Sequence, residues 1–76
     1  GPPKILGAND LADLSSLSLK KMRKKAMDQV EREVISYVLA KTAWNRSKAT
    51  KILKISYKTL LYKIKELGIQ PPPDAL

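Results

Sequence analysis

The feature that most constrains this chain is the segment 19–42, which lacks glycine and proline and has apolar residues every three or four positions. Such spacing places the apolar side chains on one face of an α-helix, and Ser18 directly before the segment is a good N-cap. We therefore predict one long helix. Its apolar stripe is expected to hold Leu19, Met22, Ala26, Val30, Val34, Tyr37 or Val38, and Lys41.

A second row of apolar residues, Met27, Ile35 and Leu39, widens the apolar arc of this helix. A wide arc has to be covered on two sides. One side is expected to meet the chain's own C-terminal region, and the other either a second copy of the helix or a wider core within one chain. With 76 residues and neither cysteine nor histidine, the chain has no disulfide or obvious zinc site, so we predict a homodimer.

Residues 45–68 form either one basic helix or two short ones. A single helix would keep most apolar residues on one stripe, but Ile55 falls off that stripe. Asn45 and Ser56 are each followed by helix-forming sequence and are plausible N-caps. We predict two helices, the first starting after Asn45 and the second covering about residues 57–67.

The end of the second helix is predicted from Gly68, which suits a left-handed residue just past a helix. Ile69 can make the apolar contact that accompanies such an ending, and the prolines that follow prevent continuation. The residues 60, 64 and 67 are expected in the core. The predicted fold class is all-α.

The two ends of the chain are predicted to be less regular. Residues 1–8 resemble an interdomain linker, and Gly1 and Pro2 are consistent with the remnant of a cleaved tag on an excised domain. A short helix capped by Asn9 or Asp10 is expected to include Leu11, Leu14 and Leu17. Residues 70–76 form a tail.

The charge of the chain is concentrated in its C-terminal part. The net charge is +8, and residues 45–69 hold seven Lys or Arg against one acidic residue. This imbalance is typical of proteins that bind a phosphate-rich partner. No apolar run has the length of a membrane span, so we expect a cytoplasmic protein.

Residues 30–69, VEREVISYVLAKTAWNRSKATKILKISYKTLLYKIKELGI, carry a more specific pattern. It comprises N-x-x-x-A from Asn45, S-x-x-T-L from Ser56, K-I-K-x-L-G-I from Lys63, and the apolar Ile52, Leu53 and Ile55. This pattern resembles the Fis-type helix-turn-helix of the nucleoid protein Fis and of the C-terminal domains of bacterial enhancer-binding activators of the NtrC family, which are sigma-54-dependent.

The resemblance implies a homodimer held by an intermolecular four-helix bundle over residues 9–44, followed by a helix-turn-helix over residues 45–69. It also implies that the last helix enters the major groove of a palindromic site on double-stranded DNA, in the bacterial nucleoid. The chain is then the DNA-binding domain of an activator whose ATPase domain lies elsewhere, or alternatively a Fis-like nucleoid protein that bends DNA.

The resemblance and the charge together assign candidate site residues. For base readout they are Ser56, Tyr57, Lys58, Thr59 and Tyr62; for phosphate contact, Asn45, Lys48, Lys63 and Lys65; for the dimer interface, Leu14, Leu17, Met22, Ala26, Met27, Val30 and Val34. Asn45 has the alternative role of a helix cap alone.

Three positions depart from the family pattern, and the first is Thr50, where the family usually has an alanine. Tyr57 stands where the family commonly has an arginine that binds guanine, so base recognition must differ; alternatively, Tyr57 is a partly buried neighbour of Leu60, Leu61 and Ile64. Lys54 stands where the family usually has a glycine with a left-handed backbone.

Other functions are less compatible with the sequence. The absence of histidine, cysteine and a glycine-rich phosphate loop argues against an enzyme, and no metal, cofactor or small-molecule substrate is expected. A basic amphipathic protein that binds a membrane surface is the main competitor, although its single tryptophan, Trp44, lies in a polar stretch. A module that only dimerises would leave the basic last helix unexplained.

Overall fold

The computed structural model describes residues 18–73, and these form three helices. They are α2 (Leu19–Lys41), α3 (Arg46–Leu53) and α4 (Tyr57–Glu66), and the described residues contain no strand. The all-α prediction and the division of the basic region into two helices are both confirmed. The short helix predicted around residues 11–17 lies outside the described residues.

The chain divides into two compact units, Gly1–Val30 and Glu31–Leu76, with the boundary inside α2. In the first unit, the described residues are Ser18 and the beginning of α2. The hydroxyl of Ser18 accepts a hydrogen bond from the Lys21 amide at 3.2 Å, which confirms the predicted N-cap. One turn later, Lys24 forms an ion pair with Asp28 at 2.8 Å.

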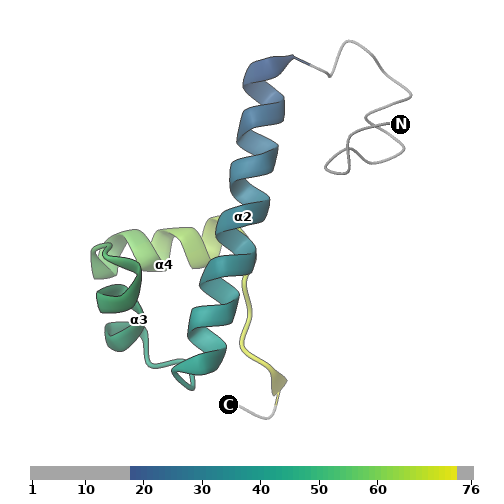
Figure 1. The fold of residues 1–76 in the computed structure, drawn as a ribbon. Coiled ribbons are helices and arrows are strands. Elements are labelled where there is room, and N and C mark those ends of the chain that lie inside the picture. Colours follow the sequence, from purple (N-terminus) through teal and green to yellow (C-terminus); the bar gives the residue numbers. More distant parts are fainter. Residues whose placement is uncertain (1–17, 74–76) are drawn as a thin grey trace. The chain divides into compact units, whose positions relative to one another are not determined.

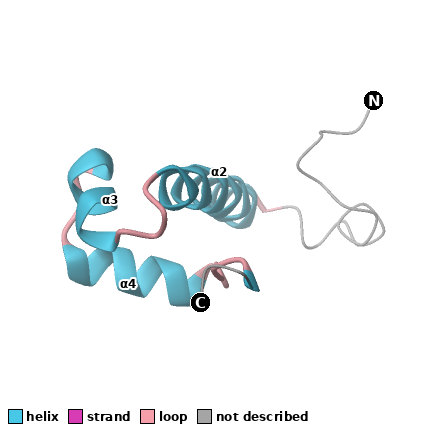
Figure 2. Ribbon diagram, turned by 90° about the horizontal axis from the view of Figure 1, so that it is seen from below, coloured by secondary structure: helices cyan, strands magenta, loops and turns pink. Residues whose placement is uncertain are grey.

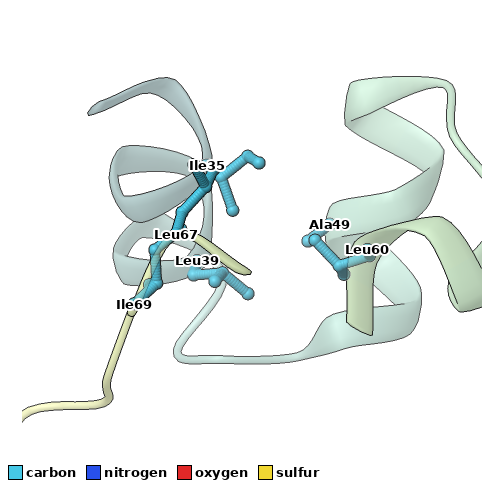
Figure 3. Packing of buried hydrophobic residues seen from close by; sticks show 6 residues of the cluster. All are labelled: Ile35, Leu39, Ala49, Leu60, Leu67 and Ile69. Atoms are coloured by element: carbon cyan, nitrogen blue, oxygen red, sulfur yellow. The ribbon is translucent and has the colours of Figure 1, made fainter. Parts of the chain in front are cut away.

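In the second unit, α3 and α4 lie on one side of the C-terminal part of α2, and α4 runs across it (Figures 1 and 2). The buried core, shown in Figure 3, is small and entirely apolar. Its members are Ile35, Leu39, Ala49, Leu60, Leu67 and Ile69, with Val38, Trp44, Leu53, Ile55 and Ile64 packed against them. Of the core residues predicted on α4, Leu60 and Leu67 are buried and Ile64 is half-buried.

The α2–α3 connection contains two consecutive residues with left-handed backbone, Ala43 (φ 52°) and Trp44 (φ 62°). The Trp44 amide donates to the carbonyl of Leu39 at 2.7 Å, which closes the end of α2. The side chain of Trp44 is half-buried against the core. The turn is therefore held by a backbone hydrogen bond and by an apolar side chain.

The α3–α4 turn depends on a third residue with left-handed backbone, Lys54 (φ 57°, ψ 43°), as predicted. Its amide donates to the carbonyl of Thr50, and the Ile55 amide donates to the same oxygen at 3.2 Å. These bonds satisfy a carbonyl at the end of α3 that has no partner within the helix. The chain then enters α4 after only three residues.

The end of α4 has the geometry of a Schellman motif. Gly68 has a φ of 66°, its amide donates to Lys65, and the Ile69 amide donates to the carbonyl of Ile64 at 3.0 Å. Ile69 is buried in the core. The left-handed glycine and the apolar contact predicted from the sequence are both confirmed.

Candidate nucleic-acid interface

The two short helices begin at side-chain caps. Oδ1 of Asn45 accepts the Lys48 amide at 3.0 Å, and Oγ of Ser56 accepts the Thr59 amide at 3.1 Å. The Ser56 hydroxyl also donates to Oγ1 of Thr59 at 2.8 Å. Ser56 and Thr59 thus form two hydrogen bonds with each other at the beginning of α4. The base contacts predicted for these two residues have to form while these hydrogen bonds are kept.

The packing of α3 against α4 depends on a small residue. Ala49 on α3 and Leu60 on α4 are both fully buried and are drawn near each other in Figure 3. A methyl side chain at position 49 lets the two helices approach closely, as in a helix-turn-helix. Both residues belong to the same buried cluster, which holds α3 and α4 together.

The C-terminal half of α4 is held to α2 by two polar contacts. Nζ of Lys63 lies 2.6 and 2.7 Å from the two carboxylate oxygens of Glu31. Nε of Arg32 donates to the carbonyl of Leu67 at 3.1 Å, so a cation lies where the helix dipole favours one. Together with the buried Leu67 and Ile69, these contacts fix the orientation of α4.

The side of α4 away from the core is a basic surface with apolar residues on it, and we call it the α4 outer surface. It consists of Tyr57, Lys58, Leu61, Tyr62 and Lys65, all exposed. Tyr57 is 47% exposed, Leu61 42% and Tyr62 64%. A cationic helix face of this kind suits the major groove of DNA, whose edges are flanked by phosphates.

The structure brings most of the predicted DNA-contacting residues to the surface. Ser56, Tyr57, Lys58 and Tyr62 are exposed, as are Asn45, Lys48 and Lys65, whereas Thr59 is half-buried. Tyr57 is 47% exposed, which is compatible with both roles given for it, base contact and partial burial beside Leu60 and Ile64. Lys63, which was predicted to contact phosphate, is half-buried, and its ammonium group contacts Glu31 of α2.

Leu61 is the surface residue that sequence analysis missed. It was named only in the alternative given for Tyr57, as a neighbour of Leu60 and Ile64, and it is 42% exposed. The signal was present in the spacing, because Leu61 follows Tyr57 by four positions and shares its face. Both residues lie beside the lysines of the α4 outer surface.

The candidate dimer residues lie on one helix wherever they are described. Met27, Val30 and Val34 are exposed on α2, and Met22 and Ala26 are half-buried. Leu14 and Leu17 lie outside the described residues. The neighbouring Tyr37 is 63% exposed, and Nζ of Lys41 lies 5.5 Å from the centre of its ring. The described residues therefore leave an apolar face of α2 uncovered.

Residues 18–73 contain neither a cluster of metal-ligating side chains nor a membrane-spanning helix. No group of His, Cys, Asp and Glu side chains in this range could hold a metal ion. None of the described helices is both long and apolar enough to cross a membrane.

The capped helix pair, the tight turn and the basic outer surface define a helix-turn-helix of the DNA-binding type. The family model described as bacterial regulatory protein, Fis family, matches residues 26–67. This chain belongs to that family, and the predicted Fis-type helix-turn-helix is confirmed.

One relative is the response regulator protein PilR of Pseudomonas aeruginosa. It is 30% identical over 63 residues, which cover 83% of this chain. The chain spans only 13% of the length of that relative. No solved structure matches the chain significantly.

Proposed function

We propose that this chain is the DNA-binding domain of a bacterial enhancer-binding activator of the NtrC family, and that it binds a palindromic site on double-stranded DNA as a homodimer. The α4 outer surface carries the proposal, because its exposed lysines surround side chains that can reach base edges. The match to a small part of a much longer response regulator favours a domain of a larger regulator over a separate nucleoid protein.

The exposure of these residues supports a specific role for each of them in DNA binding. Tyr57, Lys58 and Tyr62 face the bases, with Ser56 and Thr59 at the beginning of the helix. Lys65, Lys48 and Asn45 contact phosphates, and the amides at the beginning of α3 favour an anion nearby. Lys63 contributes to DNA binding mainly by fixing α4 against α2 through Glu31.

DNA binding is tested by fluorescence anisotropy of the domain with a labelled mixed-sequence duplex across a range of salt concentrations. We expect affinity to fall steeply with salt, because bound lysines release counterions from the phosphates. The variant Lys58→Ala/Lys65→Ala should bind more weakly and with a smaller salt slope. The variant Lys24→Ala/Lys41→Ala removes the same charge from α2 and is the matched control.

The outcomes of this experiment separate the candidate functions. Absence of binding at low salt would contradict the proposal, and binding to anionic vesicles instead would favour the membrane alternative. Equal losses in the two double variants would show that binding depends on net charge and not on the α4 outer surface.

The homodimer is proposed to form through the exposed face of α2, which contains Val30 and Val34. Sedimentation equilibrium should give twice the monomer mass for the wild type and the monomer mass for Val34→Glu. Ile52→Glu is the control, because Ile52 is a similarly exposed aliphatic residue on α3, at 53% against 47% for Val34. A monomeric wild type at high concentration, or equal dissociation of both variants, would contradict this interface.

A further inference from the structure

The α4 outer surface lacks the side chains that proteins most often use to distinguish bases. Helix α4 has no Arg, Asn, Gln or Asp, and its one carboxylate, Glu66, is at its C-terminal end. Adenine is normally recognised by Asn or Gln, cytosine by Asp or Glu, and guanine by Arg or Lys. Among these bases, only guanine has a customary partner on this surface, in Lys58 or Lys65.

The hydroxyl groups at the beginning of α4 are already engaged. Oγ of Ser56 accepts the Thr59 amide and donates to Oγ1 of Thr59. Thr59 is also half-buried. The polar groups next to the first turn of α4 are therefore used largely to hold the helix, which leaves Tyr57 and Leu61 as prominent side chains on the adjoining surface.

Tyr57 and Leu61 form an apolar pair. They are four residues apart on one helix, so their side chains are neighbours, and they are 47% and 42% exposed. Leu60, next to Leu61 in the sequence, is fully buried, so Leu60 and not Leu61 fills the core at this position along the helix. The pair is bordered on the helix surface by Lys58 and Lys65, which places it next to the groups proposed to hold DNA.

We infer that Tyr57 and Leu61 recognise the C5 methyl groups of thymine in the major groove, and that they give the domain a preference for half-sites with thymine under the first turns of α4. The methyl group is the feature of base edges that apolar side chains recognise. Both residues lie in the N-terminal half of α4, the part of a recognition helix that reaches the bases. The inference rests on the proposed function and specifies which feature of the bases the α4 outer surface recognises.

The test uses DNA that differs only in the methyl group. A binding site is first selected from a randomised duplex library with the wild-type domain, and the enriched duplex is then synthesised with thymine or with deoxyuridine at every thymine position. Base pairing is the same in both. We expect the Kd to rise about fourfold for each contacted methyl that is removed, from the transfer free energy of one such group.

Substitutions test whether Tyr57 and Leu61 cause the difference in Kd between the thymine and deoxyuridine duplexes. Leu61→Ala and Tyr57→Ala should each reduce the ratio between the deoxyuridine and thymine Kd values, whereas Tyr57→Phe should retain it because the ring contact remains. Ile52→Ala, an exposed aliphatic residue on α3, should also retain the full ratio. Circular dichroism checks that the variants are folded, which is expected because neither Tyr57 nor Leu61 belongs to the buried core.

The results distinguish failure of the inference from failure of the proposed function. Equal Kd values for thymine and deoxyuridine duplexes, together with tight salt-dependent binding, would overturn the inference and leave DNA binding intact. If the selection enriched no sequence from the library, the inferred preference for thymine would be contradicted as well. A methyl effect unchanged in both alanine variants would assign it to other residues, and absence of binding to any duplex would contradict the proposed function.

Discussion

Lys54 shows how a single residue can carry backbone strain in a short turn. Its φ of 57° lies in the left-handed region, which costs a residue with a Cβ about 1 kcal/mol relative to glycine. The side chain is exposed, so its removal loses little packing. We expect Lys54→Gly to raise the free energy of unfolding by up to about 1 kcal/mol in urea denaturation.

Lys51 provides the control for this substitution. It is an exposed lysine three residues earlier, in right-handed helical conformation within α3. Lys51→Gly removes the same charge and side chain but should lower the free energy of unfolding by about 1 kcal/mol, because glycine is a poor helix former. Destabilisation by both substitutions would argue against strain at Lys54.

The contact between Lys63 and Glu31 is expected to stabilise the packing of α4 on α2. The two side chains are about one-third and one-quarter exposed, and each carboxylate oxygen lies within 2.7 Å of the ammonium group. Lys63→Met should lower the free energy of unfolding by about 1 kcal/mol, because it leaves a partly buried carboxylate without this cation.

The matched variant is Lys65→Met, on the exposed side of the same helix. It should change stability little but reduce the salt slope of DNA binding more than Lys63→Met does. The opposite pattern would show that Lys63 leaves Glu31 when DNA binds and contacts a phosphate directly.

At the scale of elements, the helix boundaries were largely predictable because capping is local. Asn45 and Ser56 each accept the amide three residues later, and that signal is contained in a few consecutive residues. Ser56→Ala should lower the free energy of unfolding by about 1 kcal/mol, measured by urea denaturation.

Ser47→Ala serves as the control for the cap. Ser47 is an exposed residue within α3, where alanine is a better helix former, so this substitution should be neutral or slightly stabilising. A neutral Ser56→Ala would mean that water or another group satisfies the Thr59 amide equally well.

What the sequence did not reveal depends on contacts between distant residues. Lys63 meets Glu31 across 32 positions of sequence, and no local pattern indicates that these two side chains pair. Likewise, the apolar stripe predicted over residues 60, 64 and 67 did not indicate where Leu61 lies. Only the packed helices show that Leu61 remains outside the core.

The two apolar rows of α2 illustrate the same limit. Periodicity identified both rows, and in the structure Ile35 and Leu39 of the second row are buried in the core, whereas Met27 is exposed. In the first row Val30 and Val34 remain exposed, whereas Met22, Ala26 and Val38 are half-buried. We propose that a second copy of the chain covers this face. The sequence pattern predicts that the face is covered, but it does not identify the covering surface.

At the scale of the whole molecule, the proposed homodimer links stability to concentration. If folding and association are coupled, the Tm should rise with protein concentration, because the dimer is favoured by mass action. The Val34→Glu variant should have a lower Tm that does not depend on concentration. Differential scanning calorimetry at several concentrations checks this, and a constant wild-type Tm would argue against a coupled dimer.

The half-buried Trp44 at the end of α2 has a spectroscopic consequence. It is the chain's only tryptophan and belongs to the unit Glu31–Leu76, so its fluorescence emission reports the loss of packing in that unit alone. Far-ultraviolet circular dichroism, in contrast, records helix along all of α2. Coincident denaturation curves from the two signals would mean that the helix unfolds together with the helix-turn-helix, and separated curves that its first turns unfold independently.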